Sequence, residues 1–279
     1  MASSAQFADD YQAATVFDSL SLRGRVVVIT GGAKGIGLAL GFAVAEANAS
    51  VAIVDAAPEP DPAFAKLKQM SPKAGYYQSD VTDYQRLQDT FALIGSDFGR
   101  VDGLITAAGI VSDQPLLQRD PVGVKTCLEI NSLGTYYSVR LAVEQMVKQP
   151  LRSGDASVGS IVTIASIAAH QASKGQYTSD YCMSKGAVLS LTKQLGVELA
   201  QHGIRINCLS PGYIATDLTA DLVRKHPTLG DIFNSEPPMK RMGKRSDLKA
   251  AAVFLLSDAS SYMTSAEMLI TGGMHAGRI

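Results

Sequence analysis

The sequence of 279 residues lacks several features that would each assign a class of protein. It has 25 lysines and arginines against 26 aspartates and glutamates, so the formal net charge is −1. Such a balance provides no basic surface for nucleic acid or an anionic membrane. No apolar stretch approaches the roughly 20 residues that span a bilayer, and the first residues carry acids without the basic and apolar run of a secretory signal. We therefore expect a cytoplasmic protein without nucleic-acid or membrane partners.

Cysteine is also scarce. The three cysteines, Cys127, Cys182 and Cys208, lie far apart in apolar surroundings, and their spacing matches no zinc site. The four histidines show no pattern that would support thiol catalysis. We expect buried, reduced thiols and no metal.

Apolar residues are plentiful, at 46% of the chain against 18% charged residues, which is enough for a substantial core. Short β-branched runs alternate with longer helical patterns, which predicts a parallel sheet with helices on both faces. The predicted fold is a single α/β domain with a doubly wound (Rossmann) sheet over residues 22–279, preceded by an arm of residues 1–21. The predicted strands span 25–30, 50–55, 76–81, 101–109, 159–166, 204–212 and 267–273.

The first predicted strand runs directly into a glycine-rich turn, TGGAKGIG, at residues 30–37. Glycines at 31, 35 and 37 allow a tight turn whose N–H groups approach a pyrophosphate at a helix N-terminus. The spacing differs from the G-x-G-x-x-G pattern, so a simple tight turn stays an alternative. Its position at the first βα turn of a doubly wound sheet favours dinucleotide binding.

Asp55 ends the second predicted strand, about 20 residues beyond the glycines. An acid there accepts hydrogen bonds from the adenosine ribose and repels a 2′-phosphate. This favours NAD over NADP, although Lys34 inside the glycine turn points the other way and a capping role for Asp55 remains an alternative. NAD is the expected cofactor, with NADP left open.

Tyr181 and Lys185 stand four residues apart in a predicted helix of mostly small and apolar residues. Residues at this spacing share one helix face. The pair alone is compatible with a solvated face or with a phenol whose pKa is tuned by an ammonium group.

Further motifs decide between these readings. In chain order they are TGGAKGIG (30–37), DV (80–81), AAG (107–109), Asn131, Ser166, YCMSK (181–185) and PGYIAT (211–216). With these motifs the chain, from about residue 22 to residue 273, closely resembles the short-chain dehydrogenase/reductase family. The resemblance implies an NAD(P)-dependent oxidoreductase, assembled as a homodimer or homotetramer, that interconverts a secondary alcohol and a ketone by hydride transfer.

The resemblance also implies a catalytic set of Asn131, Ser166, Tyr181 and Lys185. Tyr181 would be the general acid in reduction and the general base in oxidation. A free phenol has a pKa of about 10, so we expect Lys185 to lower it toward neutral pH. Ser166 would hold the substrate oxygen, and Asn131 would order a water that links Lys185 to solvent.

The cofactor-binding residues implied by the resemblance are Gly31, Lys34, Gly35, Ile36, Gly37, Asp55, Asp80, Val81, Ala107, Ala108, Gly109, Tyr181, Lys185, Pro211, Gly212, Ile214 and Thr216. Two motifs depart from the family pattern. The chain has TAAG where relatives often have Asn-Asn-Ala-Gly, and ITGG where many have Asp-Gly-Gly. Neither departure touches the four catalytic positions.

Residues 213–243 are predicted to form a lid over the substrate. Ser166, Gln171, Gln176 and Tyr213 are candidate substrate contacts. Within the family the chain most resembles fungal polyol and ketose reductases, namely arabinitol 2-dehydrogenase, mannitol 2-dehydrogenase and sorbose or xylulose reductase, which implies a polyol/ketose pair as substrate. The alternatives are a bulkier carbonyl compound of secondary metabolism and, in another class, a dinucleotide-binding protein without turnover.

Overall fold

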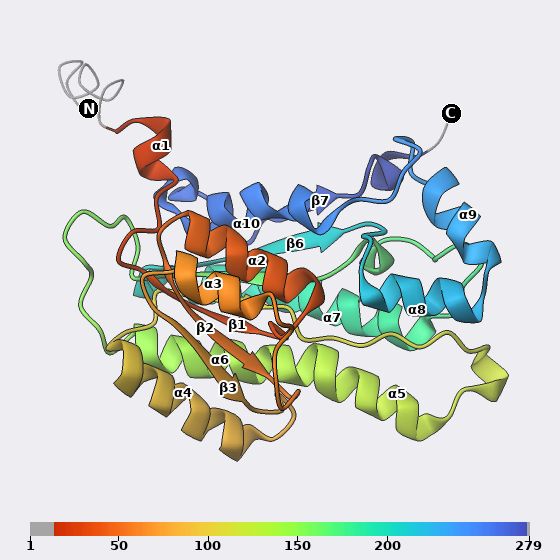
Figure 1. The fold of residues 1–279 in the computed structure, drawn as a ribbon, viewed down its shortest axis with the longest axis horizontal. Coiled ribbons are helices and arrows are strands. Elements are labelled where there is room, and N and C mark those ends of the chain that lie inside the picture. Colours follow the sequence, from red (N-terminus) through yellow and green to blue (C-terminus); the bar gives the residue numbers. More distant parts are fainter. Residues whose placement is uncertain (1–13, 278–279) are drawn as a thin grey trace.

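A computed structural model describes residues 14–277 of the chain. Seven parallel strands form one sheet in the order β3-β2-β1-β4-β5-β6-β7 (Figure 1). This order confirms the predicted doubly wound α/β fold, in which the chain reverses its direction of winding between β1 and β4. The strands are β1 (Val26–Thr30), β2 (Ser50–Asp55), β3 (Ala74–Gln78), β4 (Gly103–Thr106), β5 (Gly159–Ile164), β6 (Ile204–Pro211) and β7 (Glu267–Ile270).

Helices cover both faces of this sheet. Helices α2, α3 and α10 pack on one face, and α4, α6 and α7 pack on the other (Figure 1). The central strands read as continuous β-branched runs because both of their faces are buried. The helices are α1 (Val16–Ser19), α2 (Gly35–Glu46), α3 (Phe64–Met70), α4 (Tyr84–Phe98), α5 (Pro121–Leu128), α6 (Gly134–Met146), α7 (Ser179–Glu198), α8 (Asp217–Lys225), α9 (Thr228–Ser235) and α10 (Lys249–Leu256).

The predicted helical region after β4 contains an irregularity that its sequence did not signal. A π-helical turn over Glu129–Leu133 joins α5 to α6. Such turns occur frequently at functional sites. This turn carries Asn131, whose side chain is fully buried.

Five strands end earlier than predicted, β3 to β7, and two of them border a cleft. The run at 76–81 forms β3 over Ala74–Gln78, and the run at 101–109 forms β4, which ends at Thr106. The residues beyond both ends, including Asp80 and Gly109, line a cleft rather than continuing the sheet. The carboxyl edge of the sheet therefore has open loops where the motifs lie.

The predicted arm lies partly outside the described residues, which begin at residue 14. Residues 16–19 form the short helix α1, which buries none of its residues. Leu22, by contrast, is completely buried. The described chain thus contributes to the core from Leu22 onward.

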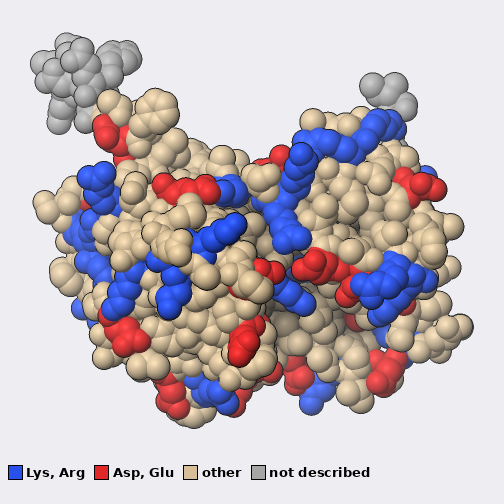
Figure 2. Space-filling view, viewed as in Figure 1, with Lys and Arg blue, Asp and Glu red and all other residues tan. Residues whose placement is uncertain are grey.

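Residues 213–243 include α8 and α9, which pack together through a small cluster of their own. Leu222, Leu229 and Phe233 are its buried members. The Tyr213 ring lies against Phe233 with centroids 4.3 Å apart. These helices stand beside the carboxyl edge of the sheet, at the right of Figure 1. The face of the molecule seen in this view has a hollow near its centre, and charged side chains of both signs surround the hollow (Figure 2).

Candidate active site

The glycine turn lies at the carboxyl end of β1. Gly31 has φ +69°, and a Cβ there would lie 2.3 Å from the Ala108 backbone nitrogen. A Cβ on Gly37 would lie 2.1 Å from the Gly31 carbonyl oxygen. Both positions therefore require glycine for close packing of turn, helix and strand end. Gly35, at φ +64°, has open space around it.

This turn leaves the N-terminus of α2 open to the cleft. Lys34 occupies the N-cap position, and no side chain caps the helix there. Free N–H groups and the helix dipole together favour an anionic group such as a pyrophosphate. The close-packed glycines and the uncapped helix thus fit a dinucleotide.

One cleft brings together most of the residues predicted to bind the cofactor. It runs from the glycine turn past the ends of β2, β3 and β4 to the start of α8. Its lining includes the predicted residues Gly31, Lys34, Gly35, Ile36, Gly37, Asp55, Asp80, Val81, Ala107, Ala108, Gly109 and Thr216. Pro211, Gly212, Ile214, Tyr181 and Lys185 line the adjoining pocket instead.

Asp55 is held in place by two backbone N–H groups. Its Oδ2 accepts from Ala33 N at 2.9 Å and its Oδ1 accepts from Ala57 N at 3.0 Å. Asp55 therefore caps these backbone N–H groups and also lies on the wall of the cleft. The two interpretations of Asp55 are therefore compatible, because each carboxylate oxygen can accept a further hydrogen bond.

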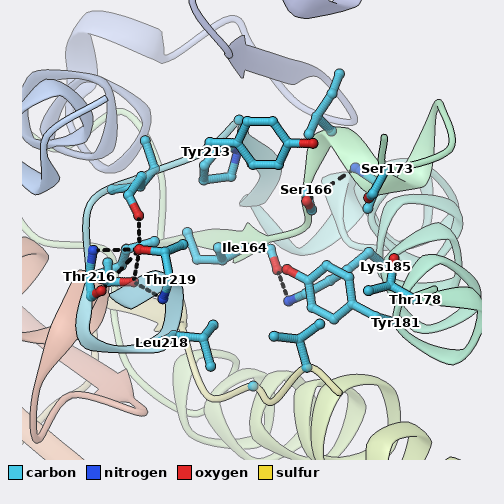
Figure 3. A pocket seen from close by; sticks show the side chains of 18 of the residues that line it. Ile164, Ser166, Ser173, Thr178, Tyr181, Lys185, Tyr213, Thr216, Leu218 and Thr219 are labelled. Carbon is cyan, nitrogen blue, oxygen red and sulfur yellow. Dashed lines mark hydrogen bonds between the residues drawn. The ribbon is translucent and has the colours of Figure 1, made fainter. Parts of the chain in front are cut away.

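Ser166, Tyr181 and Lys185 converge on the second pocket from β5 and α7. Ser166 follows β5 and caps a short 3₁₀ helix, its Oγ accepting from Ala168 N at 3.1 Å. Lys185 is buried and donates from Nζ to the Ile164 carbonyl oxygen at 2.8 Å. Its Nζ lies 5.6 Å from the centre of the Tyr181 ring. Figure 3 shows the Tyr181 hydroxyl and the Lys185 nitrogen pointing into the same space.

The electrostatic balance at Tyr181 differs from the expected one. Burial raises the pKa of Tyr181 to about 12, and a hydrogen bond with Ser166 opposes this only in part. Burial likewise lowers the pKa of Lys185 to about 8. We expected Lys185 to lower the pKa of Tyr181 toward neutral pH. The protein without cofactor does not show this, because the loss of hydration on burial destabilises the phenolate more than its neighbours stabilise it. Tyr181 is a neutral phenol at pH 7.

Asn131 acts on the backbone around the site. Its side-chain amide exchanges hydrogen bonds with Ile110, accepting at 2.8 Å and donating at 2.9 Å. Nδ2 also donates to Ser184 Oγ at 2.9 Å, and that hydroxyl donates to the Tyr181 carbonyl. Asn131 thereby ties the loop after β4 to α7. Its predicted role in ordering a water stays a prediction.

The second pocket has two kinds of wall. The loop between β5 and α7 supplies hydroxyl and amide groups from Ser166, Ser173, Gln176 and Thr178. Residues 213–243, the predicted lid, supply Tyr213, Leu218, Leu222 and Phe233, and Tyr213 lies above Leu218 in the view of Figure 3. The substrate candidates Ser166, Gln176 and Tyr213 therefore line the pocket, whereas Gln171 is not among its lining residues.

Several lining residues were not found from the sequence. Ser173 and Thr178 belong to an irregular loop that carries no pattern. Asp217 and Asp221 line the cofactor cleft from α8. Their spacing of four after the capping residue Thr216 was a signal, because it places both carboxylates on one helix face.

The motif at 211–216 lies between the two cavities. Ile214 pairs with Gly243 in an isolated parallel bridge, and Thr216 caps α8 through reciprocal hydrogen bonds with Thr219. The segment after β6 is thus anchored at the start of α8, next to the first cleft.

The described residues, 14–277, contain neither a membrane-spanning helix nor a metal-binding cluster. No helix among these residues is long and apolar enough to cross a membrane. No group of three or more histidine, cysteine or acidic side chains within the same range could hold a metal ion. Cys127 and Cys208 are buried as expected, whereas Cys182 is only partly buried.

A doubly wound sheet with a glycine turn at its switch point, adjoining a serine–tyrosine–lysine pocket, defines a dinucleotide-dependent oxidoreductase. Residues 31–275 match a family model described as enoyl-(acyl carrier protein) reductase. The chain belongs to the short-chain dehydrogenase/reductase family, whose members use NAD or NADP.

Similar proteins support this assignment along nearly the whole chain. An L-rhamnose 1-dehydrogenase (NAD(P)(+)) of Sphingomonas sp. is 34% identical over 257 residues, covering 91% of this chain and 97% of that protein. A ribulose-forming D-arabinitol 2-dehydrogenase of Scheffersomyces stipitis is 30% identical, with 95% and 98% covered. The crystal structure of a short-chain type dehydrogenase/reductase from Mycobacterium marinum superposes with a TM-score of 0.86 at 34% identity, covering 93% and 99%.

Proposed function

We propose that the protein interconverts a secondary alcohol and a ketone of a polyhydroxylated compound, a polyol/ketose or sugar pair, with NAD as the preferred cofactor. The observation that carries the proposal is the convergence of Ser166, Tyr181 and Lys185 in a pocket that adjoins the glycine-turn cleft. A dinucleotide-binding protein without turnover would need none of these three side chains.

When bound, the nicotinamide supplies or accepts the hydride, and the proton chemistry falls to the chain itself. Tyr181 is protonated at neutral pH, which suits it to donate a proton to a ketone oxygen during reduction. Ser166 stands beside it to hold that oxygen. Alcohol oxidation needs the phenolate, so it is favoured by alkaline pH.

The preference for NAD rests on the charges around the cleft. Asp55, Asp80, Asp217 and Asp221 line it, against Lys34 as a cation. A 2′-phosphate near these carboxylates is disfavoured by like-charge repulsion. Comparing kcat/KM for NAD and NADP tests this, and a clear NADP preference contradicts it.

The substrate class follows from the polar wall of the pocket. Ser166, Ser173, Gln176 and Thr178 offer donors and acceptors for several hydroxyl groups. The names of the arabinitol and rhamnose dehydrogenases among its relatives agree with such a substrate.

A bulkier, partly apolar carbonyl compound is the second candidate. Val111, Leu218, Leu222 and Phe233 form an apolar wall that a small polyol would not fill. A panel of five- and six-carbon polyols and sugars, alongside aliphatic and aromatic secondary alcohols of similar size, separates the two. Turnover of the apolar alcohols alone contradicts the first candidate.

We also propose a homodimer or homotetramer. Apolar side chains are exposed on α7 and the neighbouring π turn, including Met183, Val197 and Leu133. Patches of this kind mark association surfaces. Light scattering of the purified protein tests this, and a monomer at micromolar concentration contradicts it.

A further inference from the structure

A buried ion pair stands directly behind Tyr181. Arg119 Nη1 lies 2.5 Å from Asp180 Oδ1, with the two side chains 3% and 1% exposed. The same carboxylate oxygen accepts from Tyr181 N at 2.8 Å. Asp180 also lies in the first turn of α7, where Thr178 at the N-cap makes no side-chain capping bond. The carboxylate therefore satisfies a backbone donor of the very residue that carries the phenol.

Arg119 extends this contact to two loops. Its Nη1 donates to Ser112 Oγ at 2.8 Å, and its Nη2 donates to the Gln114 carbonyl at 2.8 Å. Nη2 also donates to the Tyr177 carbonyl. The loops are joined again where Gln114 N donates to the Tyr177 carbonyl at 3.0 Å. One guanidinium thus connects the loop after β4, the loop before α7 and α7 itself.

These loops form part of the pocket wall. Val111, next to Ser112 in sequence, lines the pocket, and so do Gln176 and Thr178, which flank Tyr177. A shift of the loops relative to α7 would therefore change the distance between the Tyr181 hydroxyl and any substrate held by the wall.

Stability alone does not account for the pair. Arg119 Nε is buried with no hydrogen-bond partner among residues 14–277. Removing two charges from water is costly, and an apolar pair of similar volume is often as stable. A buried pair with an unsatisfied donor is better explained by the geometry that it fixes.

We propose that Arg119 and Asp180 are positioning residues that hold Tyr181 against the substrate-binding loops. This inference rests on the proposed function, in which Tyr181 transfers the proton. Neither Arg119 nor Asp180 lines either cavity, so the two residues act through Tyr181 and the loops.

Arg119→Met is compared with Arg25→Met as a matched control. Arg25 is also a buried arginine in an ion pair, 2.5 Å from Asp258, and it lies at the amino end of β1, away from the site. Its partner carboxylate is 27% exposed, so this control matches the loss of a buried guanidinium rather than of a fully buried pair. We expect kcat of Arg119→Met to fall about 10- to 100-fold, since small displacements of reacting groups have effects of this size. The Kd for NAD should stay within about twofold of the wild type, and the solvent deuterium isotope effect on kcat should increase. Arg25→Met should keep the wild-type kcat and isotope effect.

Equal kcat values for the two variants, measured well below both melting temperatures, contradict the proposal.

If Arg119→Met does not fold, Asp180→Asn is compared with Asp258→Asn in the same assays. In Asp180→Asn the amide oxygen can still accept from Tyr181 N, but Arg119 loses its charged partner. A several-fold loss of kcat in Asp180→Asn alone supports the proposal, and no difference contradicts it. A wild-type enzyme without turnover on the substrate panel contradicts the proposed function and this inference with it, whereas an active wild type with unaffected variants contradicts the positioning role alone.

Discussion

The two cavities at the carboxyl edge of the sheet are built in different ways. The cofactor cleft consists mainly of strand ends and turns, with Gly31 and Gly37 packed where no larger side chain fits. The second pocket, proposed to bind the substrate, takes its walls from a loop of irregular sequence and from the predicted lid, residues 213–243, which has a small apolar cluster of its own. Backbone geometry determines the first, and contacts between distant segments determine the second.

This difference has a consequence for substitutions. Changes in the cofactor cleft alter the course of the backbone or the charge that meets the dinucleotide. Changes in the second pocket alter a wall whose apolar part comes from α8 and α9, which have a small apolar cluster of their own. Tyr181 lines only the second pocket, whereas Gly109 and Thr216 line both cavities.

Replacement of Tyr181 by phenylalanine should produce the largest effect. The change removes the proton donor and retains the ring, so kcat/KM should fall by about 10²- to 10⁴-fold, the usual contribution of general acid–base catalysis. The dinucleotide Kd, measured by fluorescence titration, should change little. Unchanged turnover on a verified substrate would show that Tyr181 does not transfer the proton.

Gly37→Ala should separate the backbone-built cavity from its neighbour. Its Cβ would meet the Gly31 carbonyl oxygen at 2.1 Å, so the turn must move. We expect the dinucleotide Kd to weaken by at least about tenfold, or about 1.4 kcal/mol. Gly123→Ala in α5 is the control, because no atom lies within 4 Å of its added Cβ. Equal Kd values for both variants contradict the close-packing argument.

Asp55→Asn should change the choice of cofactor. The amide no longer repels a 2′-phosphate, and its oxygen can still accept one of the two backbone hydrogen bonds. The ratio of kcat/KM with NADP to that with NAD should rise by about tenfold, which corresponds to about 1.4 kcal/mol. The exposed Asp89→Asn on α4 provides a control for net charge. A ratio that does not move assigns Asp55 to capping alone.

Phe233→Ala should affect the substrate pocket selectively. The variant removes a ring that is 1% exposed and packs against Tyr213, so the lid loses part of its apolar cluster. KM for the carbonyl or alcohol substrate should rise about five-fold, or about 1 kcal/mol, while the NAD Kd stays constant. Parallel rises in both constants would mean that the two cavities are not independently built.

Lys185→Met should stabilise the folded protein slightly. The pKa of Lys185 is about 8 in the folded chain and about 10.4 when unfolded, so between these values the unfolded state binds more protons and the wild type gains stability as pH rises. At pH 7 the buried ammonium is a cost that methionine removes, which should raise the free energy of unfolding by about 1 kcal/mol. The gain should shrink between pH 8 and pH 10, as measured by thermal unfolding, and a constant difference contradicts the assignment of that pKa.

The sequence predicted the alternating order of strands and helices and the residues of the glycine turn because both follow from local patterns. Continuous β-branched runs of strand length are typical of strands buried on both faces, and glycines directly after the first such run are typical of a dinucleotide-binding turn. The π turn around Asn131 escaped prediction, since it depends on side-chain bonds to Ile110 and Ser184 from distant segments. Gln171 was a plausible substrate contact by residue type, but it is not among the residues that line the pocket.

The amino-acid sequence by itself determined the doubly wound sheet, the dinucleotide turn and the order of the catalytic motifs, because each arises from residues that are close along the chain. The tertiary structure alone decided which side chains form the two walls of the substrate pocket and that Arg119 stands behind Tyr181. It also decided that the pKa of Tyr181 is raised to about 12 rather than lowered, since burial depends on what the rest of the chain packs around it.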